Sequence, residues 1–332
     1  MTDLRDFLAD LPGPDAEASA AAAARQERLT KPAGSLGRLE ELAIWLAAWQ
    51  GRHPPTLDSA HVLVFAGNHG IAARGISAYP AEVTVQMVAN FRAGGAAINQ
   101  LAASAGAELS VIDIELDRPT ADFTVEPAMT PGDFARALDI GVAAVPEAAD
   151  VVLLGEMGIG NTTAAAALAR ALFGGEAGDW VGAGTGMDAD GIRRKAQVVR
   201  QAIECHGAAL DDPIEALRRV GGRELAAIAG AVAAARQRRI PVILDGFVAT
   251  VAAAVLARID GAALDHCQMA HLSAEAGHRR LLERLEKRPL LDFDMRLGEA
   301  SGAAVALAVL RSAMAAHNGM ATFEEAGVDG KS

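Results

Sequence analysis

The sequence predicts an α/β protein built on a mostly parallel, doubly wound sheet. From Pro54 onward, short apolar runs alternate with segments of helical periodicity, the order expected of strands joined by right-handed crossover helices. Hydrophobic residues make up 51% of the 332 residues and aromatic residues only 4%, a composition typical of helices packed closely on a sheet. Glycine-rich and polar segments follow nearly every expected strand. Because ligands of such sheets bind at the carboxyl ends of the strands, we expect the functional site there.

The expected elements follow in chain order. Residues 1–30 are Ala-rich and helix-prone, and the turn-rich segment 31–37 leads into an amphipathic helix with apolar residues from Leu36 to Trp49 on one face. Strands are expected at 61–66, 109–114, 151–154, 180–183, 240–244, 264–269 and 290–293. Helices are expected at 81–91, 96–105, 133–144, 164–172, 192–210, 223–236 and 249–256. The last helix, 300–316, is apolar nearly all round and should be buried.

The charge and the cysteine content exclude several classes of function. The formal net charge is -12 with acids spread along the chain, so nucleic acid is not an expected partner. Cys205 and Cys267 form neither a metal-ligand pair nor a disulfide framework. Asp292 and Asp294 alternate along an expected strand, but oxygen-ligated metals usually need more acids, so no metal is expected. No secretory leader or membrane-spanning stretch is visible, which predicts a cytoplasmic protein without membrane contact.

The segment 155–163, with the sequence GEMGIGNTT, lies between an expected strand and an expected helix. A strand, a glycine-rich turn and a helix together aim backbone N–H groups at an anion. The spacing approaches that of a P-loop, but Asn161 stands where that motif has its lysine. Without this counter-charge, we interpret the segment as a loop for one phosphate rather than for a triphosphate. The alternative is a turn whose glycines serve only close packing.

Three charged residues near strand ends are candidates for the chemistry. Lys195 follows a second glycine-rich loop, 182–186, and is either the cation of a monophosphate site or a solvated helix lysine. Glu299 precedes the last helix, where desolvation would raise its pKa towards that of a general base. The alternative for Glu299 is an acid favoured by the helix dipole. Glu156 is a second acid at the same level, or a structural hydrogen-bond acceptor, and His69 in its glycine-bounded turn is expected to be structural.

Several motifs run in order along the chain. They include KPAGSLG at 31–37, NHG at 68–70, GISAYP at 75–80, VTVQM at 83–87, GGAAIN at 94–99, GEMGIGNTT at 155–163, DGF at 245–247, SAEAGH at 273–278 and RLGEASGA at 296–303, with the glycine-rich loop 182–188 among them. Together they closely resemble the family of nicotinate-nucleotide–dimethylbenzimidazole phosphoribosyltransferases. Asn68 stands where many relatives have Asp.

The resemblance implies a fold, an assembly and a reaction. The fold would be a Rossmann-like sheet in a large catalytic domain, 56–302, with a small helical domain built from residues 1–55 and 303–332. The protein would be a homodimer that acts on small molecules without a cofactor. It would transfer the ribose 5-phosphate of nicotinate mononucleotide to 5,6-dimethylbenzimidazole or a related base, releasing nicotinate, in assembly of the nucleotide loop of cobalamin.

The resemblance also implies roles for individual residues. Glu299 would be the general base and Glu156 a supporting carboxylate. The substrate-binding residues would be Ser77, Tyr79, Gln86, Met157, Gly158, Gly160, Asn161, Thr162, Gly184, Thr185, Gly186, Asp188, Lys195, Asp245, Ser273, Leu297 and Gly298. Two alternatives remain: a transferase that uses phosphoribosyl pyrophosphate, suggested by the segment 242–245, and a non-catalytic nucleotide-binding protein.

Overall fold

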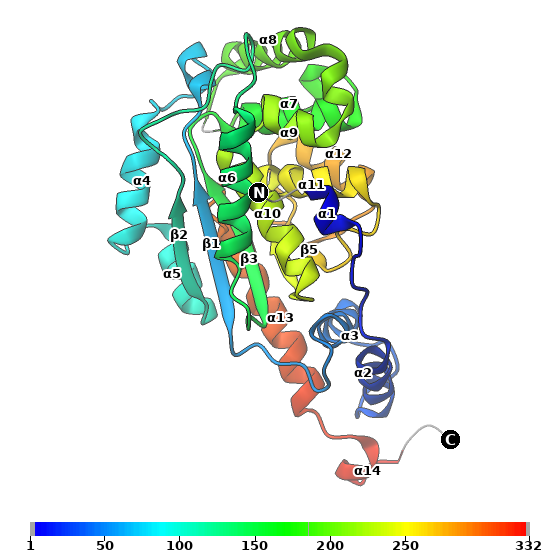
Figure 1. Ribbon diagram of the computed structural model, residues 1–332. Coiled ribbons are helices and arrows are strands. Elements are labelled where there is room, and N and C mark those ends of the chain that lie inside the picture. Colours follow the sequence, from blue (N-terminus) through cyan, green and yellow to red (C-terminus); the bar gives the residue numbers. More distant parts are fainter. Residues whose placement is uncertain (1–3, 185, 330–332) are drawn as a thin grey trace.

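The computed structural model describes residues 4–184 and 186–329, and one parallel sheet lies at its centre (Figure 1). The strands are β1 (Ala60–Ala66), β2 (Glu108–Asp113), β3 (Val151–Met157), β4 (Val242–Leu244), β5 (Cys267–His271) and β6 (Pro289–Leu291). They lie in the order β2-β1-β3-β4-β5-β6, and all neighbouring pairs are parallel. The direction of winding reverses between β1 and β3. The predicted α/β fold with a doubly wound sheet is confirmed.

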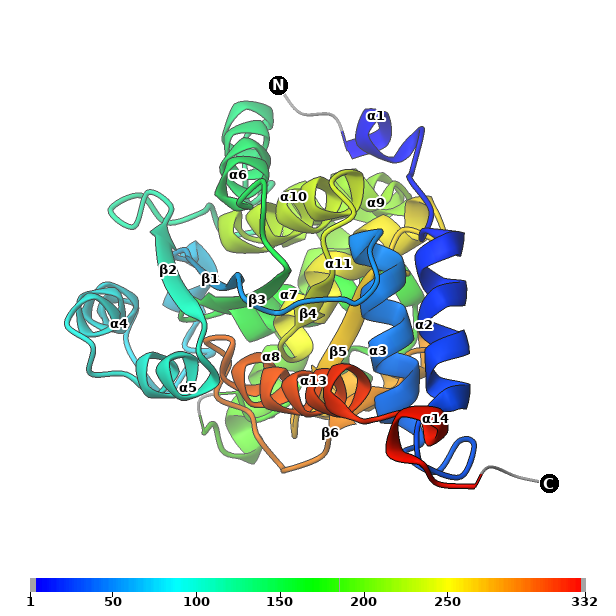
Figure 2. The same ribbon diagram turned by 90° about the horizontal axis from the view of Figure 1, so that it is seen from below.

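Helices cover both faces of this sheet (Figure 2). The helices of the described residues are α1 (Leu4–Leu8), α2 (Ala16–Arg28), α3 (Arg38–Gln50), α4 (Glu82–Arg92), α5 (Ala97–Ala105), α6 (Pro131–Ala144), α7 (Asn161–Phe173), α8 (Ala189–His206), α9 (Pro213–Val220), α10 (Arg223–Gln237), α11 (Phe247–Ile259), α12 (Ala276–Arg284), α13 (Ser301–Gly319) and α14 (Phe323–Ala326). Each expected helix is present, but the sequence does not predict α9, α12 or α14. These three are short, with eight, nine and four residues.

The central strands bury their side chains in two separate cores. Leu63 and Phe65 of β1 belong to the core shared with α6, α7, α10 and α11. Val62 and Val64 of the same strand point the other way, into the core shared with α4, α5 and α13. The first half of α13 is buried in this second core, as its apolar sequence predicts.

The expected strand at 180–183 is wrong. A short 3₁₀ turn covers Ala177–Asp179, and the residues after it form no strand. Trp180 is nevertheless buried, with its ring centroid 6.2 Å from that of Phe173. Its indole N–H donates a hydrogen bond to the carbonyl of Gly174 at 2.8 Å. The apolar run is therefore an anchor of the turn against the core, which period-two patterning cannot distinguish from a strand.

Several strand ends also differ from the expectation: β4 starts at Val242, and β5 runs from Cys267 to His271. β3 continues to Met157, so Gly155 and Glu156 belong to the strand rather than to a phosphate-binding turn. A Cβ on Gly155 would overlap the backbone of Ala300, so this glycine lets the N-terminus of α13 approach the strand. β6 ends at Leu291, so Asp292 and Asp294 follow the strand instead of alternating along it.

Helices from both ends of the chain lie together below the sheet (Figure 1). Arg25 of α2 donates hydrogen bonds to three carbonyl oxygens around the end of α13, those of His317, Asn318 and Met320. The division into two domains, 1–55 with 303–332 and 56–302, stays a prediction. α13 continues without a break across position 303, and α1 packs on α10 and α11 of the larger body.

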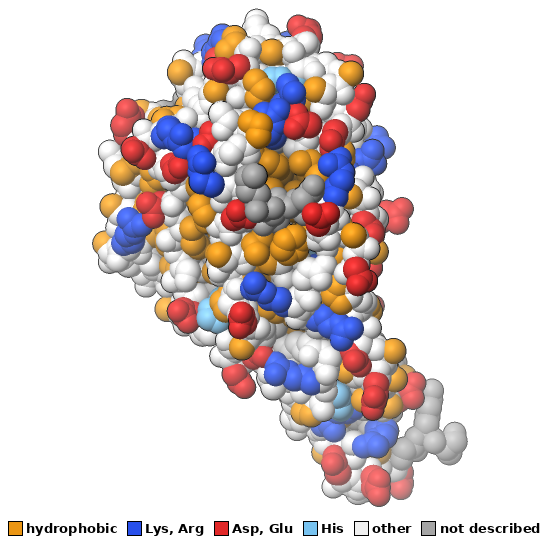
Figure 3. Space-filling view, in the orientation of Figure 1, with side chains coloured by type: hydrophobic (Ala, Val, Ile, Leu, Met, Phe, Trp, Pro, Cys, Tyr) orange, Lys and Arg blue, Asp and Glu red, His pale blue; other side chains and the backbone are white. Residues whose placement is uncertain are grey.

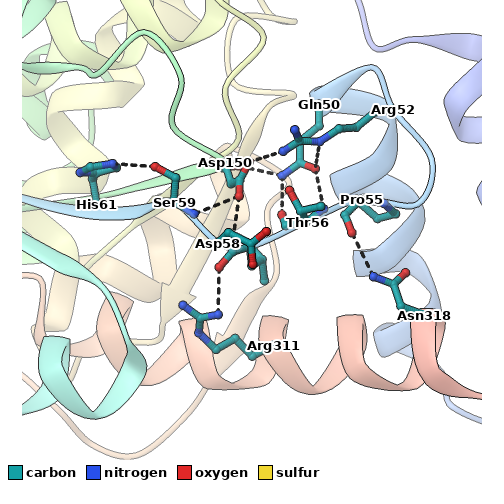
Figure 4. A network of polar contacts seen from close by, with 11 residues as sticks. Gln50, Arg52, Pro55, Thr56, Asp58, Ser59, His61, Asp150, Arg311 and Asn318 are labelled. Atoms are coloured by element: carbon teal, nitrogen blue, oxygen red, sulfur yellow. Dashed lines mark hydrogen bonds and ion pairs between the residues drawn. The ribbon is translucent and has the colours of Figure 1, made fainter.

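A polar network ties these helices to the sheet (Figure 4). The carboxylate of Asp150, just before β3, accepts hydrogen bonds from the backbone N–H groups of Asp58 and Ser59 at 2.7 and 3.0 Å. Gln50, the last residue of α3, donates to the carbonyl oxygens of Thr56 and Asp150. The segment between α3 and β1 is thus fixed to the amino end of the sheet, opposite to the end where we expect the site.

The surface carries mixed charge. On the face shown in Figure 3, Lys and Arg side chains are interspersed with Asp and Glu and form no stripe of one sign. That face therefore lacks the basic track of a nucleic-acid-binding protein. Among the described residues, no helix combines the length and the apolar character that a bilayer span requires.

Candidate active site

A cavity of about 490 Å³ opens at the carboxyl ends of β3, β4 and β5. It is lined by Tyr79, Glu156, Met157, Gly158, Ile159, Asn161, Thr162, Gly184, Gly246, Phe247, Val248, His271, Ser273, Glu275, Arg296, Leu297 and Gly298. The segments that contribute them are far apart in the sequence but end at the same edge of the sheet. This is where ligands of open α/β sheets bind.

Glu156 is a buried acid at the end of β3. Its side chain accepts a hydrogen bond from the amide nitrogen of Asn161. Burial raises the pKa of Glu156 well above its usual range, and the nearby carboxylates of Asp245 and Glu224 add to this, against the opposing effect of Asn161. A Cβ on Gly298 would lie 2.7 Å from Glu156 Oε1 at a φ of +82°, so glycine is required where the two segments meet.

Glu299 lies next to Glu156 through the backbone. Its N–H donates to the carbonyl of Glu156 at 3.1 Å, and its side chain is only 4% exposed. Burial raises the pKa of Glu299 to about 7. Glu299 directly precedes the N-cap of α13, Ala300, and no side chain caps that helix. Glu299 and Ala300 both have left-handed backbone, with φ of 63° and 61°, the kind of strain that proteins retain mostly at functional sites.

Asp245 holds the start of α13, directly after Glu299. Its Oδ1 accepts the N–H of Ala303 at 3.0 Å, in the first turn of α13. Burial raises the pKa of Asp245 to about 7, although the backbone N–H groups of α13 favour the ionised form and so limit the rise. Asp245 thus anchors the helix start that carries Glu299, without itself lining the cavity.

Two cations bond to the second glycine-rich loop and its neighbours. Lys195 comes from α8 and is 2% exposed, so the solvated-lysine alternative is wrong. Its ammonium donates to Thr162 Oγ1 at 3.1 Å and to the carbonyl of Gly182 at 3.3 Å, and burial lowers its pKa. Arg296 donates to the carbonyl of Gly184 at 2.7 Å. A buried ammonium from another helix therefore contacts Thr162 of the P-loop-like segment.

The chain is similar to known proteins over nearly its whole length. A family model described as phosphoribosyltransferase matches residues 11–328. A nicotinate-nucleotide–dimethylbenzimidazole phosphoribosyltransferase from Ruegeria pomeroyi is 59% identical over 331 residues, which cover 99% of this chain and 98% of the relative. The chain belongs to this family. A relative of the same name from Ruegeria sp. (strain TM1040) is 58% identical over 328 residues, covering 99% of this chain and 97% of the relative.

A solved structure of the nicotinate-nucleotide–dimethylbenzimidazole phosphoribosyltransferase family has the same fold. The crystal structure of the enzyme from Thermus thermophilus is 43% identical and has a TM-score of 0.88, covering 96% of this chain and 100% of that chain. The likeness therefore extends over the helices at both ends as well as over the sheet.

The residues predicted to bind substrate fall into two groups in this family member. Those that line the cavity are Tyr79, Met157, Gly158, Asn161, Thr162, Gly184, Ser273, Leu297 and Gly298. Those that do not line it are Ser77, Gln86, Gly160, Gly186, Asp188, Lys195 and Asp245. Thr185 lies outside the described residues. The binding role of every residue in both groups stays a prediction.

Some residues of the second group have a visible structural task. Ser77 Oγ accepts the N–H of Tyr79 at 3.2 Å, and Gln86 is exposed on α4. Gly160 is the N-cap of α7 with a φ of 99°. Asp188 caps α8 by accepting the N–H of Gly191 at 2.8 Å, so this carboxylate is engaged within the protein.

Three charged or polar cavity residues are missing from the predicted set. His271, Glu275 and Arg296 all line the cavity. They lie at strand ends or within the motifs at 273–278 and 296–303, and this position in the sequence could have identified them as site residues. Glu275 Oε1 accepts the N–H of Gly184 at 2.8 Å, and a carboxylate beside a phosphate loop is not what charge complementarity predicts. Among the described residues, no group of three or more His, Cys, Asp or Glu side chains could hold a metal ion.

Proposed function

We infer that this protein transfers the ribose 5-phosphate of nicotinate mononucleotide to 5,6-dimethylbenzimidazole or a related base, giving α-ribazole 5′-phosphate and nicotinate. The observation that carries this inference is the arrangement of charge at this edge of the sheet. Glu156 lines the cavity and is joined to Glu299 by a backbone hydrogen bond. Lys195 and Arg296 bond to Gly182 and Gly184 and form a positive side, where Glu275 also lies. Glu299 and Lys195 are not among the described residues that line the cavity. Nicotinate mononucleotide has matching polarity, with a cationic pyridinium at C1′ and an anionic phosphate at C5′.

The phosphate is assigned to the positive side, formed by the turn at Gly158, the loop at Gly184, Lys195 and Ser273. Backbone N–H groups and one buried ammonium suit a monophosphate. Glu275 accepts the Gly184 N–H in the present structure. A phosphate bound at this amide takes the place of the Glu275 carboxylate, so binding is coupled to a shift of that side chain.

The reaction needs one proton acceptor. A ring nitrogen of the benzimidazole bonds to C1′ as the bond from C1′ to the pyridinium breaks, and nicotinate leaves with a neutral ring nitrogen. The proton on the other benzimidazole nitrogen must then be removed. Glu299 is the assigned acceptor, because burial places its pKa at about 7, near the value that favours a general base. Attack on the face opposite the leaving group gives the α linkage.

Glu156 and Asp245 have supporting roles. With its pKa raised, Glu156 favours the protonated form, and the positive charge of the bound pyridinium opposes that shift. An ionised Glu156 beside C1′ stabilises the positive charge that develops on the sugar. Asp245 holds the start of α13, and through it Glu299, in place.

The activity is tested by mixing the protein with nicotinate mononucleotide and a panel of bases and following nicotinate by chromatography. We expect nicotinate release that depends on the added base, with 5,6-dimethylbenzimidazole among the substrates. Activity only with phosphoribosyl pyrophosphate and magnesium would favour the pyrophosphate-dependent alternative. Binding measured by calorimetry without nicotinate release would favour the non-catalytic one.

The pH dependence of kcat is predicted by the titration of Glu299. Glu299 accepts a proton only when it is ionised, and the ionised fraction grows as the pH rises through about 7. We therefore expect kcat to fall by about tenfold per pH unit below this value and to level off above it. The residual activity of Glu299→Gln serves as the control and should lack this acidic limb. A flat profile in the wild type would contradict the assignment.

We further propose that the protein is a homodimer, that it acts in the cytoplasm and that the reaction needs no cofactor. The exposed side chains of Tyr79 and Leu297 at the cavity leave room for a base there, and the choice of base in the cell depends on that side.

A further inference from the structure

A buried ion pair lies directly behind the turn that follows β3. His69 Nε2 and Glu224 Oε1 are 2.5 Å apart, and neither side chain is exposed to solvent. His69 comes three residues after the end of β1, and Glu224 lies in the first turn of α10. Buried polar groups of this kind need partners, because an unpaired one is costly. The pair lies beside Gly158, which lines the cavity, so its position also bears on the site.

Glycines enclose the pair on the side of the cavity. A Cβ on Gly158 would lie 3.3 Å from both His69 Nε2 and Glu224 Oε1. A Cβ on Gly160 would lie 3.3 Å from His69 Cβ. Because Gly158 and Gly160 have no side chains, the backbone of the turn packs directly on the imidazole and the carboxylate.

The rest of the turn is held from a different direction. Thr84 of α4 is buried, and its Oγ1 accepts the N–H of Ile159 at 3.1 Å. Both Gly158 and Ile159 line the cavity. The turn also packs on the backbone of Gly67, whose carbonyl oxygen would lie 2.6 Å from a Cβ on Gly158 and whose N–H donates to the carbonyl of Met157 at 3.0 Å. Thr84, Gly67 and the His69–Glu224 pair thus contact it from different directions.

The pair itself is fixed by its neighbours in the chain. Asn68 donates to the carbonyl of Leu116 at 2.7 Å, and the N–H of Gly70 donates to the carbonyl of Thr120 at 3.0 Å. These bonds hold the backbone on both sides of His69. Asn68 therefore stabilises the backbone of this segment, and it is not among the described residues that line the cavity.

We propose that the His69–Glu224 pair is a positioning unit that fixes the turn 158–160 against the phosphate end of the nucleotide. The identity of that nucleotide rests on the proposed function. Loss of the pair moves the turn and weakens the binding of the phosphate. The base site lies on other segments, around Tyr79 and Leu297, and is left in place.

Two substitutions test this role. His69→Phe keeps a ring but removes the hydrogen bond, and Glu224→Gln keeps the shape but removes the charge. For both we expect the KM for nicotinate mononucleotide to rise by about ten- to a hundredfold, because a misplaced binding group costs this much. The KM for 5,6-dimethylbenzimidazole should stay unchanged. His69→Gln, whose amide can still donate to Glu224, should recover most of the affinity.

A matched control separates positioning from general stability. His266 is also fully buried, bonds to the carbonyl of Val232 at 3.1 Å and precedes β5 at the opposite end of the sheet. His266→Phe should lower the melting temperature without changing either KM. The proposal is overturned if the His69 and Glu224 variants behave like His266→Phe, or if the two KM values rise together.

If the wild type releases no nicotinate, the proposed function fails. Calorimetric titration of Glu224→Gln with nicotinate mononucleotide then still tests the pair.

Discussion

Replacing Glu299 with glutamine is expected to lower kcat by about 10²–10⁴-fold, the usual contribution of a general base. The substitution keeps the size of the side chain and removes only its ability to accept the proton of the benzimidazole. Binding of nicotinate mononucleotide, measured by calorimetry, should remain close to that of the wild type. Stopped-time chromatography of nicotinate gives kcat directly.

The environment of Glu299 explains why no neighbour should replace it. Asp245 does not line the cavity, and its Oδ1 already accepts the N–H of Ala303. The carboxylate of Glu156 is bonded to Asn161, and its pKa is raised well above the usual range. Glu27→Gln, an exposed acid on α2, is the control and should have wild-type kcat. A wild-type kcat in Glu299→Gln would rule out Glu299 as the base.

Replacing Lys195 with alanine is expected to raise the KM for nicotinate mononucleotide by about 10- to 100-fold. A hydrogen bond to a charged group is worth roughly 1.5–3 kcal/mol, and each 1.4 kcal/mol is about tenfold in affinity. The buried ammonium bonds only to Thr162 and to the carbonyl of Gly182 among its described contacts, so it retains a donor for a phosphate. Steady-state kinetics over a range of nucleotide concentrations measure the change.

A substrate without the phosphate tests whether Lys195 acts on that group. Nicotinate riboside lacks the group that Lys195 is assigned to hold, so its KM should be the same in the wild type and in Lys195→Ala. Lys287→Ala, a lysine that donates to the carbonyl of Leu264 away from the cavity, should leave both values unchanged. An unchanged KM for the nucleotide in Lys195→Ala would place the phosphate elsewhere.

The fold could be predicted from the sequence because strands and helices alternate with clear periods. The errors arose where residues are apolar or small for a reason other than a strand or helix period. Trp180 and its neighbours are apolar because they anchor a turn to the core, and local patterning carries no sign of that. Gly155 is a glycine because Ala300 packs against it, a contact between residues far apart in the chain.

The candidate site could be located from the sequence, but its internal contacts could not. Glycines and acids after each strand identify the correct edge of the sheet. That Lys195 reaches Thr162 depends on how α8 packs on α7, and that His69 meets Glu224 depends on where α10 begins. Glu275 escaped prediction because its carboxylate bonds to the amide of Gly184, a place that charge reasoning reserves for an anionic ligand.

A crystal structure of Glu299→Gln with nicotinate mononucleotide and 5,6-dimethylbenzimidazole would show both substrates in place. We expect the phosphate within hydrogen-bond distance of Lys195 Nζ and the Gly184 N–H, with the Glu275 carboxylate displaced. We also expect the N–H of the base to face the side chain at position 299. A phosphate bound away from Lys195, or a base whose N–H points away from position 299, would contradict the account.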